Sequence, residues 1–85
     1  MSKRKWQIMD FILGREEITA YDLVDAWGVT LENARMMLLR SYKQRWLNRR
    51  KVREGGIIVY AYRLSDKALR FLDEFGSFLD HKWYG

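Results

Sequence analysis

The stretch 19–40 constrains this chain more than any other, because a glycine separates two runs of apolar residues with helical spacing. The apolar residues of the first run are Leu23, Val24 and Trp27. They fall on one face of a predicted helix over 20–27. Gly28 follows where that helix must end, at a position that favours the positive φ that glycine adopts at little cost. Thr30 then suits the N-cap of a longer helix over about 31–45. The stretch predicts two helices joined by a tight turn.

Hydroxyl residues mark the starts of the other helices. Ser2 precedes an apolar run over about 3–13 that Gly14 ends, which predicts a first helix. Thr19 with Asp22 three residues later forms a capping box for the helix over 20–27. Ser65 precedes a broad apolar stripe, which predicts a last helix to about residue 82.

Two strand-like runs, 47–53 and 57–64, flank Glu54-Gly55-Gly56, a strong hairpin signal. The second run alternates between larger apolar or aromatic side chains and smaller or polar ones, as a half-buried strand does. A β-hairpin is therefore expected between the third and the last helix.

The order and spacing of these segments resemble the winged helix-turn-helix family, with 47–64 as the wing. The resemblance covers most of the chain, and the segment 62–68 is similar to the strand-to-helix junction that follows the wing in this family. It implies an α+β fold in one domain over 1–85: a three-helix core, a hairpin wing and a long C-terminal helix. It also implies that Ile18 forms a short strand added to the wing.

Composition narrows the possible partners. The 85 residues include 16 Lys and Arg against 11 Asp and Glu, a formal charge of +5, which favours a polyanionic partner such as nucleic acid. A membrane surface is also anionic, so the placement of the charge must decide. No apolar run approaches the roughly 20 residues of a membrane span. The chain has no cysteine, which suits a reducing cytoplasm.

The second helix of the turn carries the candidate base-reading side chains. Asn can pair with adenine, Arg with guanine, and an apolar group can touch the thymine methyl. The residues expected near DNA bases are Thr30, Asn33, Met36, Met37 and Arg40. A plain solvated face is the competing interpretation, but such faces seldom expose two adjacent methionines.

A run of basic residues without an acid spans Lys43 to Arg53. Basic residues also protect edge strands against aggregation, but this run exceeds what protection needs. The side chains expected at the DNA backbone or minor groove are Lys43, Arg49, Arg50, Lys51 and Arg53.

Catalysis has little support in the sequence. His81 has no acid–base partner at a suitable spacing, and no cluster of metal ligands or glycine-rich phosphate loop is present. No catalytic residue, metal, cofactor or small-molecule ligand is expected. Most aromatic residues lie at core-facing positions, which favours packing over stacking on bases.

The sequence therefore predicts a small transcriptional regulator that binds double-stranded DNA in the cytoplasm with sequence preference. Two alternatives stay open. One is an architectural protein that coats duplexes with little preference, and the other is a winged helix that binds a protein within a larger assembly.

Surplus apolar surface further predicts a homodimer. The first helix is apolar on two faces, and a small domain is expected to cover only one of them. The stripe of the last helix also continues past the expected end of the core. The residues expected at the dimer interface are Ile8, Phe11, Ile12, Phe75, Phe78, Leu79 and Trp83.

Overall fold

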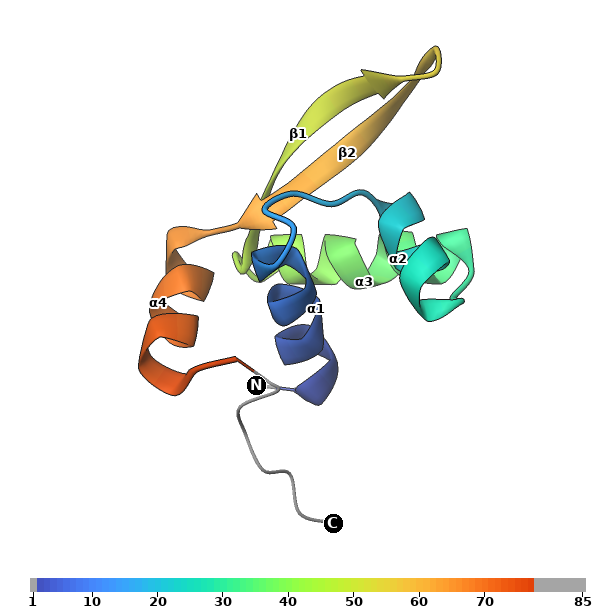
Figure 1. Ribbon diagram of the computed structural model, residues 1–85. Helices are drawn as coiled ribbons and strands as arrows, with labels where there is room; N and C mark the ends of the chain where they lie inside the picture. Colours follow the sequence, from blue (N-terminus) through green and yellow to red (C-terminus); the bar gives the residue numbers. More distant parts are fainter. Residues whose placement is uncertain (1, 78–85) are drawn as a thin grey trace.

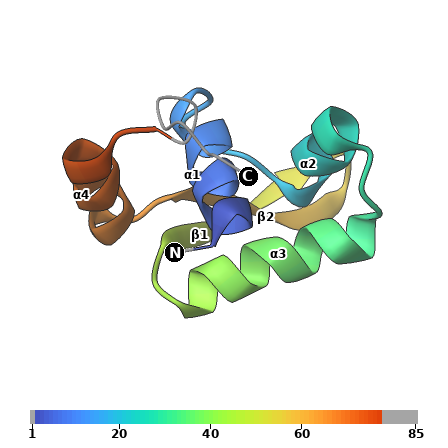
Figure 2. The same ribbon diagram turned by 90° about the horizontal axis from the view of Figure 1, so that it is seen from below.

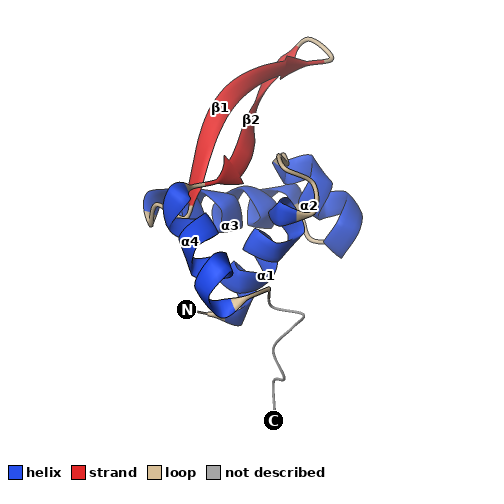
Figure 3. Cartoon of the chain, turned by 60° about the vertical axis from the view of Figure 1, so that its left-hand side comes forward, coloured by secondary structure: helices blue, strands red, loops and turns tan. Residues whose placement is uncertain are grey.

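The computed structural model describes residues 2–77, which form four helices and a two-stranded antiparallel sheet. The elements in chain order are α1 (Lys3–Leu13), α2 (Ala20–Trp27), α3 (Leu31–Lys43), β1 (Leu47–Glu54), β2 (Ile57–Leu64) and α4 (Asp66–Phe75). The helices gather at one end, and the β1–β2 hairpin projects away from them (Figures 1 and 3). The predicted α+β class is confirmed. Among the described residues, no helix is both long and apolar enough to cross a membrane.

The helix starts lie where the sequence predicted them. The side-chain oxygens of Ser2, Thr30 and Ser65 accept hydrogen bonds from backbone N–H groups three residues later, at 3.3, 3.1 and 3.2 Å. At α2 the Asp22 carboxylate accepts from the N–H of Thr19 at 2.8 Å. These bonds satisfy donors that a helix cannot satisfy internally.

Glycines shape both tight turns. Gly28 has a φ of 66° and ends α2, as predicted. Gly55 and Gly56 have φ values of 55° and 84°, so both central residues of the two-residue hairpin turn lie in the left-handed region. The hairpin pairs Leu47 with Leu64 at its base and Glu54 with Ile57 at its tip.

Ile18 contributes less than the sequence predicted. It exchanges two backbone hydrogen bonds with Tyr62, at 3.0 and 2.7 Å, but forms an isolated bridge and not a strand. The expected short strand therefore shrinks to one residue beside β2.

Both apolar faces of α1 are covered by the chain itself. One face joins a core built from α2, α3 and the hairpin base, where Ile8 and Ile12 lie. The other face carries Trp6 and Met9, which pack against α4. Figure 2 shows α1 between α4 and α2. The indole N–H of Trp6 donates to the carbonyl oxygen of Gly76 at 3.1 Å and so ties the end of α4 to α1.

This packing corrects part of the predicted dimer interface. Ile8 and Ile12 are 1% and 0% exposed, so the expectation that they face a partner is wrong. Ile8 and Ile12 face the core built with α2, α3 and the hairpin base, and α4 covers the face of α1 that carries Trp6 and Met9, so neither face is left for a partner. Phe11 is half-buried, with its ring 5.5 Å from that of Trp27.

The last helix is shorter than predicted. It ends at Phe75 because Gly76 follows with a φ of 80°, outside helical geometry. Phe75 remains 47% exposed. The predicted interface residues Phe78, Leu79 and Trp83 lie outside the described residues.

Candidate nucleic-acid interface

Helix α3 divides into a buried face and an exposed face. Ala34, Leu38 and Ser41 are buried against the rest of the domain. Asn33, Met36, Arg40 and Lys43 are all exposed. Their spacings of three, four and three residues place them in one row along the helix. This row joins an amide, a thioether and two cations, a mixture that suits the edges and phosphates of a duplex.

Three of the five expected base-reading residues share this row. Thr30 is exposed just before it, where its hydroxyl caps α3 through the N–H of Asn33. Met37 does not join the row, because it is half-buried and packs against the core. Of the two adjacent methionines, only Met36 offers its side chain to a partner.

The base of the wing holds Arg49 within the domain. Its guanidinium lies over the rings of Tyr42 and Tyr60, 4.1 and 4.0 Å from their centroids. Cation–π contacts of this kind fix a guanidinium between α3 and β2. A hydrogen bond with Tyr62 is the main cause that raises the pKa of Arg49. Arg49 is therefore a link between helix and hairpin.

Arg50 is held by an ion pair on the other face of the hairpin. Its Nε and Nη2 donate to the two carboxylate oxygens of Glu17 at 2.9 and 2.8 Å. This hydrogen bond lowers the pKa of Glu17 and raises that of Arg50. A bidentate pair orients the guanidinium and compensates its charge, so Arg50 offers less to a phosphate than the sequence suggested.

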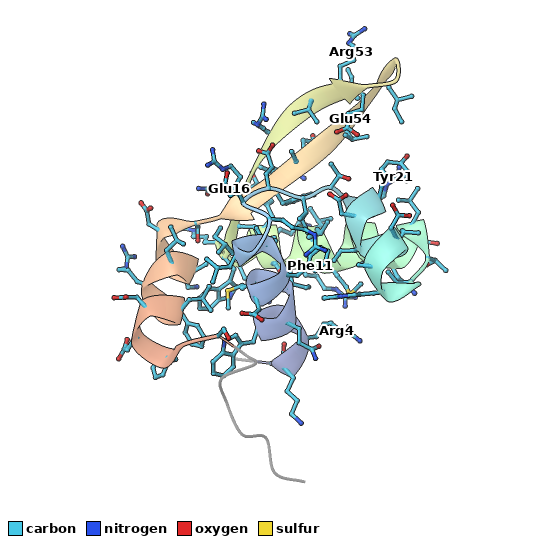
Figure 4. The ribbon with its side chains drawn as sticks, viewed as in Figure 1. Arg4, Phe11, Glu16, Tyr21, Arg53 and Glu54 are labelled. Carbon is cyan, nitrogen blue, oxygen red and sulfur yellow. The ribbon has the colours of Figure 1, made fainter. Side chains whose placement is uncertain are left out.

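The tip of the wing is different. Lys51 and Arg53 are exposed, and no acidic side chain among residues 2–77 pairs with either. Arg53 points away from the hairpin near its end (Figure 4). Lys43, at the end of α3, is also exposed and without an acidic partner in the same range. The five expected backbone-contacting residues therefore separate into three available cations and two engaged ones.

Solved structures with this arrangement of helices and hairpin come from archaea, bacteria and a plasmid-virus. A transcriptional regulator homologue from Pyrococcus horikoshii OT3 has a TM-score of 0.69 at 17% identity, over 88% of this chain and 74% of its own. PadR of Bacillus subtilis, in complex with operator DNA, has a TM-score of 0.69 at 18% identity and covers 95% of this chain. This chain covers 49% of that PadR chain. A protein from the Sulfolobus islandicus plasmid-virus pSSVx has a TM-score of 0.61 at 20% identity, over 86% of this chain and 95% of its own.

The fold is the winged helix-turn-helix. No family model and no curated protein matches the sequence. At these identities the similarity establishes the fold, and the function must be argued from the residues themselves.

Between α3 and the wing, the winged helix has a cavity of about 330 Å³. Tyr21 of α2, Arg35 and Leu39 of α3, and Ile58 and Tyr60 of β2 contribute to its lining. Arg35 is exposed and has no acidic partner among the described residues. Arg35 is not among the residues that the sequence predicts near DNA, because helical spacing puts it at the edge of the buried face of α3. Its place beside the wing depends on contacts that helical spacing does not reveal.

Most aromatic side chains pack within the protein. The rings of Trp6 and Trp46 both pack against that of Phe71, with centroids 5.1 and 5.5 Å from it. The predicted packing role is confirmed for these two tryptophans. Tyr60, the aromatic residue nearest the wing tip, is 37% exposed and stacks on Arg49.

Residues 2–77 contain no group of three or more His, Asp or Glu side chains placed to hold a metal ion. His81 lies outside the described residues. Among the described residues, the exposed row of α3 and the wing tip therefore carry the polar and charged side chains best suited to bind a partner.

Proposed function

We propose that this winged helix binds double-stranded DNA with sequence preference and acts as a small transcriptional regulator. Helix α3 enters the major groove, where Asn33, Met36 and Arg40 meet base edges. The wing tip contacts the backbone or the adjacent minor groove through Lys51 and Arg53. Phosphate contacts give affinity and register, while base contacts give the choice of site.

One observation carries this proposal: the exposed row of α3 occurs on the same fold as two wing cations, Lys51 and Arg53, that have no acidic partner among residues 2–77. The row is not needed for packing, because Ala34, Leu38 and Ser41 fill the inner face. Glu32, in the first turn of α3, opposes phosphates unless it accepts from a cytosine amine. The PadR structure with operator DNA supports the proposal by analogy of fold.

Selection of bound duplexes from a random DNA pool tests the regulator function. The expected result is an enriched sequence that the protein binds more tightly than scrambled DNA. Arg40→Ala or Asn33→Ala should cost about 1–3 kcal/mol at that site and relax its sequence preference. Arg70→Ala is the matched control, because Arg70 is an exposed arginine on α4.

The architectural alternative predicts a different outcome. If the pool yields no enriched sequence and Arg40→Ala weakens all duplexes equally, the protein coats DNA without reading it. The third reading, a protein-binding winged helix, is favoured if Met36→Ala abolishes a protein complex while no duplex binds at low salt.

We keep a homodimer in the proposal, but fewer residues support it than the sequence suggested. The buried α1 residues no longer support it, and the exposed apolar side chains of α4 that remain are Leu69 and Phe75. Sedimentation at micromolar concentration tests it, with Phe75→Asp expected to separate the copies. Such a dimer would read a palindromic site. The proposal also places the protein with nucleic acid in the cytoplasm.

A further inference from the structure

The tip of the wing carries two large apolar side chains in solvent. Ile57 and Ile58 are 52% and 61% exposed, and they directly follow the Gly55-Gly56 turn. Residues that flank the turn of a protruding hairpin are ordinarily polar. An exposed isoleucine there contributes no burial energy to the fold and promotes aggregation. Neither residue belongs to a buried cluster, although Ile58 contributes to the lining of the cavity between α3 and the wing.

The surroundings of Ile58 favour an anionic partner. Arg53 is the cross-strand neighbour of Ile58, so their side chains lie on the same face of the hairpin. Lys51 and Tyr60 form the next pair on that face. Ile57 pairs with Glu54 on the opposite face, so one isoleucine lies on each face of the tip. Lys51 and Arg53 lie on the face of Ile58 and have no acidic partner among residues 2–77. An apolar tip followed by these cations matches a surface with apolar bases inside and phosphates outside. A second protein chain would instead require acidic residues opposite Lys51 and Arg53.

The shape of the tip suits a narrow groove. Gly55 and Gly56 have no side chains, and an added Cβ at either would meet nothing within 4 Å. The hairpin also projects away from the helices, so its turn is the outermost part of the wing (Figures 1 and 3). The B-DNA minor groove is about 6 Å wide, which a slender turn can enter more easily than a helix.

We propose that the wing tip inserts Ile57 and Ile58 into the minor groove as an apolar wedge that partly unstacks a base step and bends the duplex. This inference rests on the proposed DNA binding, and it adds a way for the protein to recognise DNA by how easily it deforms. Steps such as TA unstack most easily, so the wedge adds a preference for them at a position that α3 does not contact.

Bending measured by energy transfer tests the wedge. The probe is a duplex of about 30 bp with a central TA step and a dye at each end. At saturating protein, the wild type should bend it by about 20–90°. Ile57→Thr/Ile58→Thr keeps β-branched side chains but removes their apolar ends, and it should leave the bound duplex nearly straight. Its affinity should fall about tenfold, equivalent to about 1.4 kcal/mol.

Two further variants sharpen the result. Leu13→Gln removes an exposed apolar side chain from α1 and should leave bending unchanged. Ile57→Val/Ile58→Val shortens both side chains but keeps them apolar, so an intermediate bend is expected even if the threonine variant unfolds its hairpin.

Two outcomes overturn the wedge. One is equal bending by the wild type and both double variants, which leaves DNA binding itself intact. The other is self-association of the wild type without DNA that the threonine variant abolishes, because the isoleucines then bind a second copy. Absence of duplex binding at low salt would instead refute the proposed function.

Discussion

The base and the tip of the wing each carry two basic residues, but the surroundings of the two pairs differ. At the base, Arg49 lies between two tyrosine rings and Arg50 pairs with Glu17. At the tip, Lys51 and Arg53 have no acidic partner within the described part of the chain. Four basic residues within five positions therefore have two roles. The base fastens the hairpin to the helices, and the tip is left to meet a partner.

The comparison shows that basic residues of one run have different roles, because the structure around each of them differs. Alternate residues of a strand face opposite sides, so Arg49 and Arg50 meet different neighbours. Arg49 meets the α3 side through Tyr42, whereas Arg50 meets the loop before α2 through Glu17. Farther along the hairpin, no acidic side chain among residues 2–77 pairs with Lys51 or Arg53.

The largest expected effect is on the tip. Lys51→Ala/Arg53→Ala should weaken duplex binding by about 10–100-fold near 0.1 M salt, because two phosphate contacts are lost. Fluorescence anisotropy with a labelled duplex measures this. Thermal unfolding should be nearly unchanged, and a large drop in Tm would show that the tip cations serve folding.

A smaller effect is expected at the base. Arg49→Ala removes both ring contacts and should lower Tm by a few degrees, whereas Lys51→Ala should not. Duplex affinity should fall by about threefold, because a looser hairpin costs more to order on binding. If the variant instead makes the salt dependence as shallow as loss of a phosphate contact does, Arg49 contacts DNA directly.

Removal of the negative charge of Glu54 should strengthen duplex binding, the opposite of the effect of removing the cations. Glu54 is the acidic residue of the tip, paired across the hairpin with Ile57. Glu54→Gln removes a charge that repels phosphates and should tighten duplex binding by about two- to threefold. Glu74→Gln on α4 is the matched control and should bind as the wild type does. Weaker binding by Glu54→Gln would show that Glu54 contacts a base or stabilises the turn.

The smallest effect concerns the Glu17–Arg50 pair. The pKa of Glu17 is lowered in the folded state by its hydrogen bond with Arg50. The pair should therefore stabilise the fold above the ordinary glutamate pKa of about 4.3, and lose this contribution as pH falls through the lowered value. Thermal unfolding of Glu17→Gln should differ slightly from wild type near pH 7 and coincide with it in acid. A difference that grows in acid would contradict the pairing.

Local signals predicted the fold well. Ser2, Thr30 and Ser65 mark their helices because a capping hydroxyl acts within three residues of the chain. Gly55 and Gly56 set the hairpin for the same reason. The end of α4 is also a local signal, because Gly76 interrupts the apolar stripe of the last helix.

Non-local contacts account for what the sequence could not predict. Burial of the second face of α1 depends on α4, more than fifty residues away in the chain. The capture of Arg50 depends on Glu17, at a separation of 33 residues. The half-burial of Met37, adjacent to the exposed Met36, depends on how α3 rotates against the core. Periodicity marks the faces of an element but not the neighbours that cover them.

The salt dependence of duplex binding tests the central claim most directly. Wild type and Lys51→Ala/Arg53→Ala are titrated with the same duplex from low to moderate salt. With the cations of α3 and the tip on phosphates, the slope of log affinity against log salt should be about −3 to −5 for the wild type. The double variant should be shallower by about 1.8, or 0.9 per lost contact. A flat wild-type response, or equal slopes for the two proteins, would contradict the account.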